Sequence, residues 1–391
     1  MSFFGGLYFF IILFIGLIPA VVLGLKEKRT DRYLLFFSLL LIWLIYKDTP
    51  LQLFYLFLYI FISWHIIVVH QFLQNKFGKS QKLTLYAVAW AVCPLVISKV
   101  MGILGNTIFS FVGISYITFR VIQIIIETYD GLITDVSFLN TLNFLLFFPS
   151  LSSGPIDRSR RFENDLAVKT KEEYVEMLSK GLMKILFGIL YKFVISVYFY
   201  DKLTAITGRY DPQYVVAYAY LYGIYMFFDF AGYSLMAIGT GYILGIRVPE
   251  NFNKPYISID IKDFWDRWHI SLSHWFRDFV FYRFMTNAIR KKWFKKRTQA
   301  ASVAYIVNML VMGAWHGLTF DYLLYGLYHG LLLSANEKWQ RGKWYKKHKN
   351  QLWYKVTSWF ITLNLVMFGF LIFSGYFTET VKAVFSVIFS M

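Results

Sequence analysis

Long apolar runs separated by short polar segments make up most of the sequence. Residues 3–25 contain no charged side chain, and similar runs follow along the whole chain. These runs cover residues 33–46, 51–69, 83–98, 100–126, 138–151, 182–199, 214–246, 303–335 and 356–377, and the last 12 residues add one short apolar stretch. Because a helix of about 20 apolar residues crosses a bilayer, the pattern predicts an all-α polytopic membrane protein.

Several of these runs do not fit simple spanning helices. The run 33–46 has only 14 residues. Polar or flexible residues interrupt the run 214–246, namely Asp229, Gly232, Gly239 and Gly241. We therefore expect about 11 transmembrane helices, together with re-entrant and amphipathic pieces. Irregular backbone at membrane depth is tolerated only where protein or water surrounds it, so the breaks predict a central pocket or tunnel.

The placement of charge around the first run predicts its orientation. No basic residue precedes residues 3–25, whereas Lys26, Lys28 and Arg29 follow directly. We expect an uncleaved span in the cell membrane with the N-terminus outside, because basic residues favour the cytoplasmic side. The longest polar stretch, roughly 154–180, is sufficient only for a loop with a short helix. We therefore expect one membrane-embedded domain over residues 1–391.

Composition agrees with a membrane protein. The chain is 57% hydrophobic and 16% charged, whereas soluble proteins are about 25% charged. Seven His and a single Cys exclude a disulfide scaffold and a Cys-cluster zinc site. The one thiol, Cys93, lies beside Pro94 in an apolar run, and we expect it to be buried and to have no chemical role.

The net charge of +17 has two possible explanations, nucleic-acid binding and basic cytoplasmic loops. Most of the clustered charge lies between apolar runs, at residues 26–32, 290–297 and 338–349. This placement is the one that the positive-inside rule predicts for cytoplasmic loops. We therefore expect no nucleic-acid partner.

Two histidines lie within the run 303–335, where ionisable side chains are costly. His316 is flanked by Gly313 and Gly317, which would let a substrate or backbone approach closely. Its alternatives are a functional group and a neutral imidazole that bonds to a backbone carbonyl, and the glycines favour function. His329, in the second half of the run, is expected to be structural.

A second polar cluster occupies residues 263–284, where aromatic and polar side chains alternate. Its charges exclude a lipid-exposed spanning helix, which leaves an amphipathic helix on the membrane surface or one that turns its polar stripe toward a cavity. His269 and Ser273 share a helix face, whereas His269 and His274 point about 140° apart. A metal-binding His pair is therefore not predicted, and we expect no metal.

Intramembrane histidines suit acyl transfer. A histidine that deprotonates an acceptor hydroxyl contributes about 10²- to 10⁴-fold in rate, and a second donor group can stabilise the oxyanion. Direct attack by the acceptor needs neither a metal nor a nucleophilic side chain. Neither a Ser-His-Asp order nor a GxSxG motif is visible in the sequence.

Six segments in order resemble the membrane-bound O-acyltransferase (MBOAT) superfamily. They are GISYITFR (113–120), FFPSLSSGPIDR (147–158), FFDFAGYSLMAIG (227–239), VPENFNKPY (248–256), DFWDRWHISLSHWFRD (263–278) and GAWHG (313–317). The short chain, and GISYITFR followed by Gln123 and Glu127, resemble its DltB-type branch, which takes part in D-alanylation of teichoic acids. Alginate O-acetyltransferases share the two His-containing segments.

The resemblance implies a ring of membrane helices around a central tunnel, with the motif-bearing core at about residues 100–330. It implies that His316 is the catalytic residue and His269 its companion. The donor would be D-alanine, held as a thioester on the phosphopantetheine arm of a cytosolic, acidic carrier protein, and the chain itself would bind no cofactor. Lipoteichoic acid would be the final acceptor, and other membrane components of the system would be partners. Weaker candidates for supporting roles are Asp263, Asp266, Asn253 and Ser273.

Residues 285–297, which include the basic segment 290–297, are a candidate docking site for such a carrier, because acidic and basic surfaces attract one another. An ordinary cytoplasmic loop explains the same charge. The residues considered for docking are Met285, Arg290, Lys291, Lys292, Trp293, Lys295 and Lys296.

Two alternative functions remain at this point. An O-acetyltransferase of an exported polysaccharide such as alginate would differ in donor and acceptor. A transporter or flippase would also use broken helices and intramembrane His, but it should contain two related halves, and none is visible.

Overall fold

The computed structural model describes residues 3–105 and 110–389, and it is all-α, as predicted. Within these ranges no β-strand occurs, and an isolated bridge pairs Phe252 with Trp268. Among the described residues, six helical segments are long and apolar enough to cross a membrane. They are Leu7–Leu25, Pro50–Phe77, Gln81–Ile103, Lys171–Thr204, Pro212–Ile243 and Leu352–Phe373. The multi-pass character is thereby confirmed, while the number of about 11 spans stays a prediction.

The helices form two compact units. The first comprises residues 1–189 and 232–249, and the second comprises residues 190–231 and 250–391. The boundaries fall between residues 189 and 190, 231 and 232, and 249 and 250. Whether the chain acts as the single domain we expected stays a prediction.

The first unit contains most of the N-terminal helices. These are α1 (Leu7–Leu25), α2 (Asp31–Tyr46), α3 (Pro50–Phe77), α4 (Gln81–Ile103), α5 (Ile114–Asp130), α6 (Phe138–Leu146), the 3₁₀ turn η1 (Phe148–Ser150), α7 (Ser159–Asp165), nearly all of α8 (Lys171–Leu190) and the end of α10 (Pro212–Ile243). Arg120 of α5 is buried and donates to the carbonyl oxygens of Phe144, Leu145 and Ser150. This buried arginine therefore holds the segment that follows α6, satisfying carbonyls at the end of that helix.

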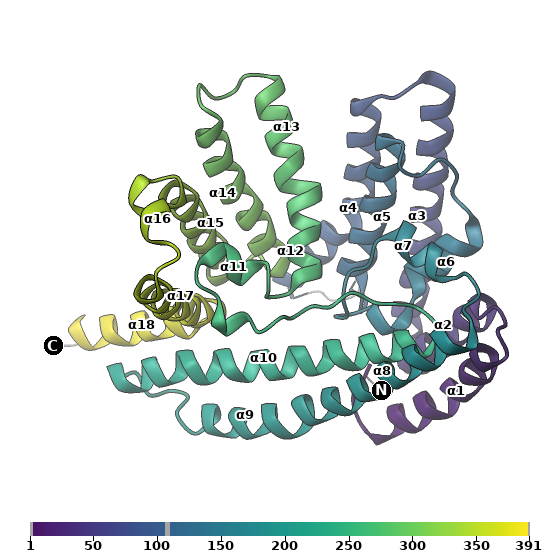
Figure 1. The fold of residues 1–391 in the computed structure, drawn as a ribbon, viewed down its shortest axis with the longest axis horizontal. Helices are drawn as coiled ribbons and strands as arrows, with labels where there is room; N and C mark the ends of the chain where they lie inside the picture. The colour runs from purple at the N-terminus through teal and green to yellow at the C-terminus, as the bar shows by residue number, and fades with distance from the viewer. Residues whose placement is uncertain (1–2, 106–109, 390–391) are drawn as a thin grey trace. The chain divides into compact units, whose positions relative to one another are not determined.

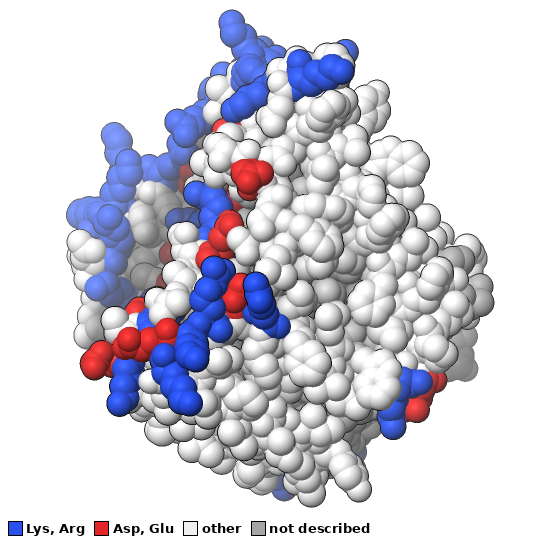
Figure 2. All heavy atoms as spheres, turned by 90° about the vertical axis from the view of Figure 1, so that its right-hand side faces the viewer, with Lys and Arg blue, Asp and Glu red and all other residues white. Residues whose placement is uncertain are grey.

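The outer face of the N-terminal helices is largely uncharged. Figure 2 shows most of the charged side chains along the left and top of this face and a small group at its lower right, with a broad area between them without Lys, Arg, Asp or Glu among the described residues. Exposed side chains of α1, α3 and α4 include Tyr8, Ile15, Phe61 and Trp90. An apolar surface of this extent is expected where a protein contacts lipid.

The second unit carries both polar clusters that the sequence singled out. Its elements are the π-helix η2 (Tyr191–Ile195), α9 (Ser196–Thr204), the first part of α10, the 3₁₀ turn η3 (Pro255–Ile257), α11 (Ile261–Trp265), α12 (Ile270–Phe276), the π-helix η4 (Arg277–Phe281), α13 (Tyr282–Arg290), α14 (Arg297–His316), α15 (Phe320–Gln340), α16 (Lys343–His348), α17 (Leu352–Phe373) and α18 (Tyr376–Phe389). Helices α13 and α14 form a hairpin whose tip contains the basic residues 290–297 (Figure 1).

The predicted break in the run 214–246 is wrong, because α10 is one continuous helix. Its glycines serve close packing instead. A Cβ atom at Gly188 of α8 would lie 2.7 Å from the carbonyl oxygen of Gly232. The other interrupting residue, Asp229, forms an ion pair with Lys192 at 2.6 Å. Sequence alone does not distinguish a glycine that bends a helix from one that lets a neighbouring helix approach.

The structure also divides one run into two helices and corrects one further expectation. The run 303–335 is a helical hairpin, α14 and α15, that turns at residues 317–319. The thiol of Cys93, which we expected to be buried, is exposed on α4. Helix α4 is a candidate membrane span, so an exposed side chain on it can face lipid. The apolar residues around Cys93 therefore fit a lipid-facing position as well as a buried one. The longest polar stretch, where we expected only a loop with one short helix, contains α7 and also the start of the long helix α8, so that expectation is only partly right.

Candidate active site

His269 lies in an unusual backbone conformation immediately before α12. Its φ of 44° and ψ of 52° place it in the left-handed region. A non-glycine residue there costs about 1–2 kcal/mol and persists only when neighbouring contacts hold it in place. The contacts around His269 must therefore hold its backbone in this conformation.

Residues 251–253 provide those contacts by pairing with residues 267–271, an arrangement that we call the histidine clamp. The backbone N–H of Asn253 donates to Arg267 at 3.0 Å, and that of Ile270 donates to the carbonyl of Asn251 at 2.9 Å. The Asn251 side chain is 0% exposed. Its Oδ1 accepts from the Oγ of Ser271 at 2.6 Å and from the Ser271 N–H at 3.3 Å. Asn251 thus binds both residues that follow His269 through main-chain and side-chain oxygens.

The imidazole of His269 is enclosed but retains one available nitrogen. The residue is 4% exposed, and its ring meets Phe230 of α10 edge to face with centroids 4.6 Å apart. Its Nε2 atom has no hydrogen-bond partner among the described residues. A buried polar atom without a partner is costly, so the Nε2 atom is suited to bond a substrate group.

His316 is presented differently, as the last residue of the regular helix α14. Its half-buried ring contacts the adjacent Trp315 at 4.5 Å between centroids. Three further aromatic side chains, from α15 and α17, lie around it, and we call these three the aromatic sleeve. The centroid distances are 5.0 Å to Phe373, 6.0 Å to Tyr322 and 6.5 Å to Tyr325. The two imidazoles lie close enough for their charges to interact. The structure therefore brings together the two histidines that the sequence singled out.

Glycines set the distance between α14 and α15, and thereby the position of the aromatic sleeve. A Cβ atom at Gly313 would collide with the carbonyl oxygen of Tyr322, and one at Gly326 with that of Met309. A Cβ atom at Gly330 would lie 2.8 Å from the Cα atom of Ile306. Small residues of this kind allow helix backbones to approach closely in membranes.

His329 lies one helical turn beyond Tyr325 and is fully surrounded. Its ring packs edge to face against Tyr325 at 4.6 Å and Trp265 at 5.2 Å. Gly369 of α17 leaves room for its Nε2 atom, which a Cβ atom would approach to 2.5 Å. Its buried Nδ1 atom has no hydrogen-bond partner among the described residues, and the structural role that we expected for it stays a prediction.

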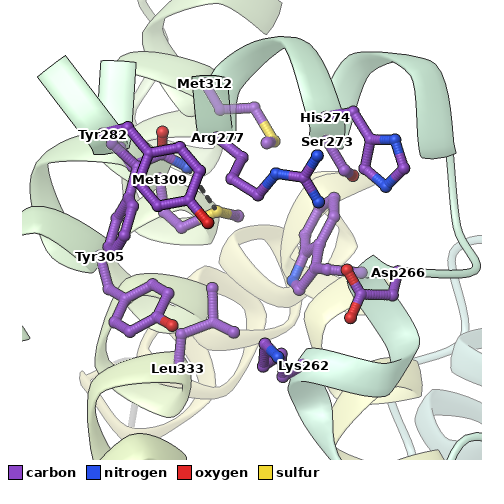
Figure 3. A pocket seen from close by; sticks show the side chains of 13 residues that line it. Lys262, Asp266, Ser273, His274, Arg277, Tyr282, Tyr305, Met309, Met312 and Leu333 are labelled. Carbon is purple, nitrogen blue, oxygen red and sulfur yellow. Dashed lines mark hydrogen bonds between the residues drawn. The ribbon is translucent and has the colours of Figure 1, made fainter. Parts of the chain in front are cut away.

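A cavity of about 110 Å³ lies beside α12 and η4 (Figure 3). Its lining combines two cationic side chains with polar and apolar groups: Lys262, Arg277, Asp266, Ser273, His274, Trp265, Phe281, Tyr282, Tyr305, Asn308, Met309, Met312 and Leu333. In Figure 3, Arg277, Ser273 and His274 lie across the cavity from Lys262 and Leu333. An apolar cavity with a few convergent polar groups is the usual form of a ligand site.

The weaker candidates from the sequence separate into two groups. Asp266 and Ser273 line the cavity. Asp263 instead pairs with Arg267 at 2.6 Å and accepts from the backbone N–H of Ile259 at 3.1 Å. Asn253 is exposed and takes part through its backbone. Within the described ranges, no group of three or more His, Cys, Asp and Glu side chains is arranged to hold a metal ion.

Sequence reasoning missed two residues that organise this region. Asn251 stands two positions before Asn253 in the same NFNKPY segment, and the sequence contains no signal to distinguish them. Asp260 caps α11 by accepting from the N–H groups of Lys262 and Asp263, both at 2.9 Å, and it also accepts from Gln340 of α15 at 3.0 Å. Its position before a short helix was a recognisable N-cap signal.

The basic tip of the α13–α14 hairpin is exposed, with one exception among the docking candidates. Met285 is 8% exposed and packs with Ala288 and Ala301 in the hairpin core. In this conformation it supports the surface and does not form part of it. The exposed candidates are Arg290, Lys291, Lys292, Trp293, Lys295 and Lys296.

Comparison with known proteins agrees with the resemblance seen in the motifs. Residues 44–378 match the sequence model of the membrane-bound O-acyltransferase (MBOAT) family. This range includes the histidine clamp, the aromatic sleeve and the cavity.

Individual relatives match over different lengths. The teichoic acid D-alanyltransferase of Bacillus subtilis (strain 168) is 42% identical over 385 residues, which cover 94% of this chain and 96% of the relative. The enzyme of the same name from Streptococcus thermophilus is 38% identical, with 96% and 95% covered. The probable alginate O-acetylase AlgI of Pseudomonas aeruginosa is 34% identical over 271 residues, covering 67% of this chain and 48% of the relative.

Proposed function

The chain belongs to the membrane-bound O-acyltransferase family, and from that premise we propose that it transfers D-alanine toward teichoic acid. The observation that carries this proposal is the 42% identity to a teichoic acid D-alanyltransferase across nearly the full length of both proteins. Family membership also makes the chain a membrane-bound acyltransferase, which removes a non-enzymatic transporter or flippase as its whole function.

In the proposed reaction, D-alanine arrives as a thioester on the phosphopantetheine arm of a cytosolic carrier protein. An acceptor hydroxyl oxygen attacks the thioester carbonyl, the C–S bond breaks, and an ester forms. His316 takes the proton of the hydroxyl and passes it to the departing thiolate, which leaves as a thiol. Its half-buried position at the end of α14 supports this role, because a general base must be reachable by the acceptor.

His269 is proposed to act on the same intermediate from the opposite side. Its buried Nε2 atom has no partner among the described side chains and backbone groups, so in the Nε2–H form it can donate to the carbonyl oxygen that becomes negative. A preorganised donor of this kind contributes about 10²- to 10³-fold to acyl transfer. Positioning of the acceptor hydroxyl is the other role open to it.

The cavity beside α12 is proposed to accept the carrier arm. Arg277 and Lys262 supply positive charge for a phosphodiester, and Met309, Met312 and Leu333 supply apolar surface for the uncharged part of the arm. The arm belongs to the carrier, so in this proposal the chain itself holds no cofactor.

The exposed tip of the α13–α14 hairpin is proposed as the carrier docking surface. Replacing Lys291, Lys292, Lys295 and Lys296 by Glu should abolish carrier pull-down, because the attraction to an acidic partner becomes repulsion. The matched control places Glu at Lys343, Lys346, Lys347 and Lys349, which changes the net charge equally at another site. Equal loss in both variants, or loss in neither, would overturn docking at the hairpin.

We further propose that the chain resides in the cell membrane with its N-terminus outside, and that lipoteichoic acid outside the membrane is the final acceptor. The positive charge that follows the first span supports this orientation. Other membrane components of the D-alanylation system are expected partners, since the donor and the acceptor lie on opposite sides.

The experiment that tests the proposed function measures D-alanine released from the cell wall by mild base. A deletion strain carries either the wild-type chain or His316→Ala, and membrane protein levels are measured in parallel. Restoration by the wild type establishes the pathway, and loss with normal levels of His316→Ala places this residue at the chemistry. Full restoration by His316→Ala would remove it as the base.

An O-acetyltransferase of an exported polysaccharide is the second candidate, favoured by the 34% identity to the alginate O-acetylase. Membranes that contain the chain should take label from D-alanyl carrier and not from acetyl-CoA. Label from acetyl-CoA alone would overturn D-alanyl transfer and favour O-acetyl transfer.

A further inference from the structure

A second basic surface, distinct from the hairpin tip, lies between α15 and α17. We call residues 338–355 the C-terminal basic segment. It contains seven Lys and Arg side chains and no Asp or Glu. These are Lys338, Arg341, Lys343, Lys346, Lys347, Lys349 and Lys355, and all are exposed. The neighbouring Glu337 pairs with Arg341 at 2.5 Å and offsets one of the seven positive charges, so the surface of the segment stays strongly positive.

An aromatic cluster is built into the same segment. Trp344 packs against Trp339 at 5.3 Å, Tyr354 at 5.7 Å and Trp353 at 6.0 Å between ring centroids. Two indole N–H groups are satisfied internally, since Trp339 donates to Tyr354 at 3.1 Å and Trp353 donates to Gln351 at 2.6 Å. The three tryptophans are still 47–51% exposed. The cluster therefore presents indole carbon surface in a fixed arrangement.

The cluster continues directly into a lipid-exposed helix. Helix α17 is a candidate membrane span that begins at Leu352. Its exposed apolar side chains start inside the basic segment with Leu352 and continue with Val356 and Phe360. Basic residues, half-exposed tryptophans and an apolar helix thus follow one another along the chain, which is the order across a membrane interface.

We propose that the C-terminal basic segment binds the headgroups of anionic phospholipids. The lysines contact the phosphate groups, and the tryptophans lie at the level between headgroups and acyl chains. Clusters of four to eight basic residues next to a span are typical of binding to acidic lipids. This inference stands apart from the proposed function and applies whatever acyl group the chain transfers.

The aromatic residues favour lipid over an acidic protein as the occupant. At the hairpin tip, Phe294 packs into the α13–α14 core and a single tryptophan, Trp293, is half-exposed, whereas the C-terminal basic segment presents three half-exposed tryptophans. In the C-terminal basic segment, exposed indoles adjoin an apolar helix face. An acidic soluble protein would leave that apolar face uncovered, whereas a bilayer covers both parts.

Binding there has a consequence for the candidate active site. The segment joins α15 to α17, and these helices supply all three rings of the aromatic sleeve around His316. Anchoring the segment at the headgroup layer fixes the depth of both helices. We therefore expect acyl transfer to be faster in bilayers that contain anionic lipid than in purely zwitterionic bilayers.

The test counts lipids bound to the purified full-length chain by native mass spectrometry, with phosphatidylglycerol and phosphatidylcholine offered in equal amounts. One variant replaces Lys343, Lys346, Lys347 and Lys349 by Gln. The matched control replaces Lys291, Lys292, Lys295 and Lys296 by Gln. A third variant places Arg at the first four positions, which keeps the charge and reports on folding.

The wild type, the hairpin control and the Arg variant should prefer phosphatidylglycerol, and the first Gln variant should lose that preference. Each lysine near an anionic surface strengthens binding about fivefold, so the loss should be well beyond tenfold.

Equal lipid preference in the two Gln variants would overturn the proposal. Displacement of the lipid by glycerol phosphate at equal concentration would show that the phosphate alone is recognised and would overturn a bilayer as the partner. Loss of carrier pull-down in the C-terminal Gln variant, with phosphatidylglycerol binding unchanged, would replace lipid by protein as the occupant.

Discussion

His269 and His316 are held in place by opposite means. His269 stands on irregular backbone, strained at a φ of 44° and held by the histidine clamp, with its ring almost completely buried. His316 ends a regular helix, and the rings of the aromatic sleeve pack around its imidazole. A strained, enclosed residue is suited to a fixed donor, whereas a half-buried residue at a helix end is suited to receive and pass on a proton.

The largest expected effect is the loss of transfer when either histidine is removed. His316→Ala should lower the initial rate of transfer from loaded carrier by about 10²- to 10⁴-fold, because the base is lost. His269→Ala should lower it by about 10²- to 10³-fold, because a donor to the oxyanion is lost. Rates per folded protein in membranes provide the measurement. A larger loss in His269→Ala than in His316→Ala would exchange the two roles.

A smaller effect is expected where the helix pair beneath His316 is forced apart. Gly313→Ala places a methyl group against the Tyr322 carbonyl and should cost about 1–3 kcal/mol of stability, with a lower melting temperature. Gly102→Ala is the matched control, because its methyl group would meet nothing within 4 Å. Equal melting temperatures for the two variants would show that the spacing of α14 and α15 does not depend on this glycine.

Removing Asn251, which holds the backbone around His269, should lower the rate by an intermediate amount. This loss should appear only when His269 is present. Asn251→Ala removes the acceptor for both Ser271 hydrogen bonds and should lower the rate about tenfold, which corresponds to roughly 1.4 kcal/mol. If Asn251 acts as a positioning residue, the same change should have little further effect on the rate in a His269→Ala background. A tenfold loss in both backgrounds would assign it a general structural role. Asn251→Asp keeps the acceptor oxygen and should preserve part of the rate.

The smallest expected effects come from the rings that touch the two imidazoles. Phe373→Leu and Phe230→Leu each remove the edge-to-face contact with one imidazole, together with contacts to neighbouring rings. A single contact of this kind is worth about 0.5–1.5 kcal/mol. We expect a two- to tenfold lower rate in each case. Because His269 is also held by the clamp, Phe230→Leu should be the milder change. The reverse order would show that the ring contact, and not the backbone, orients His269.

Much of the fold class and part of the site were predictable from local sequence. Apolar runs predicted α-helices and a membrane location because hydropathy acts over each segment separately. His316 and His269 stood out because ionisable residues are rare among apolar neighbours. The continuous helix α10 and the exposed thiol of Cys93 were not predicted. Both depend on what lies beside the helix, which the order of residues along that helix does not state.

The sequence by itself determined that this chain is a helical membrane protein of the acyltransferase type, and it singled out two histidines as candidates for the chemistry. Only the tertiary structure decided that Asn251, and not Asn253, holds His269, and that Tyr322, Tyr325 and Phe373 surround His316. The physical reason is that hydropathy and charge are properties of single segments. Hydrogen bonds and ring contacts instead require side chains from segments far apart in the sequence to meet.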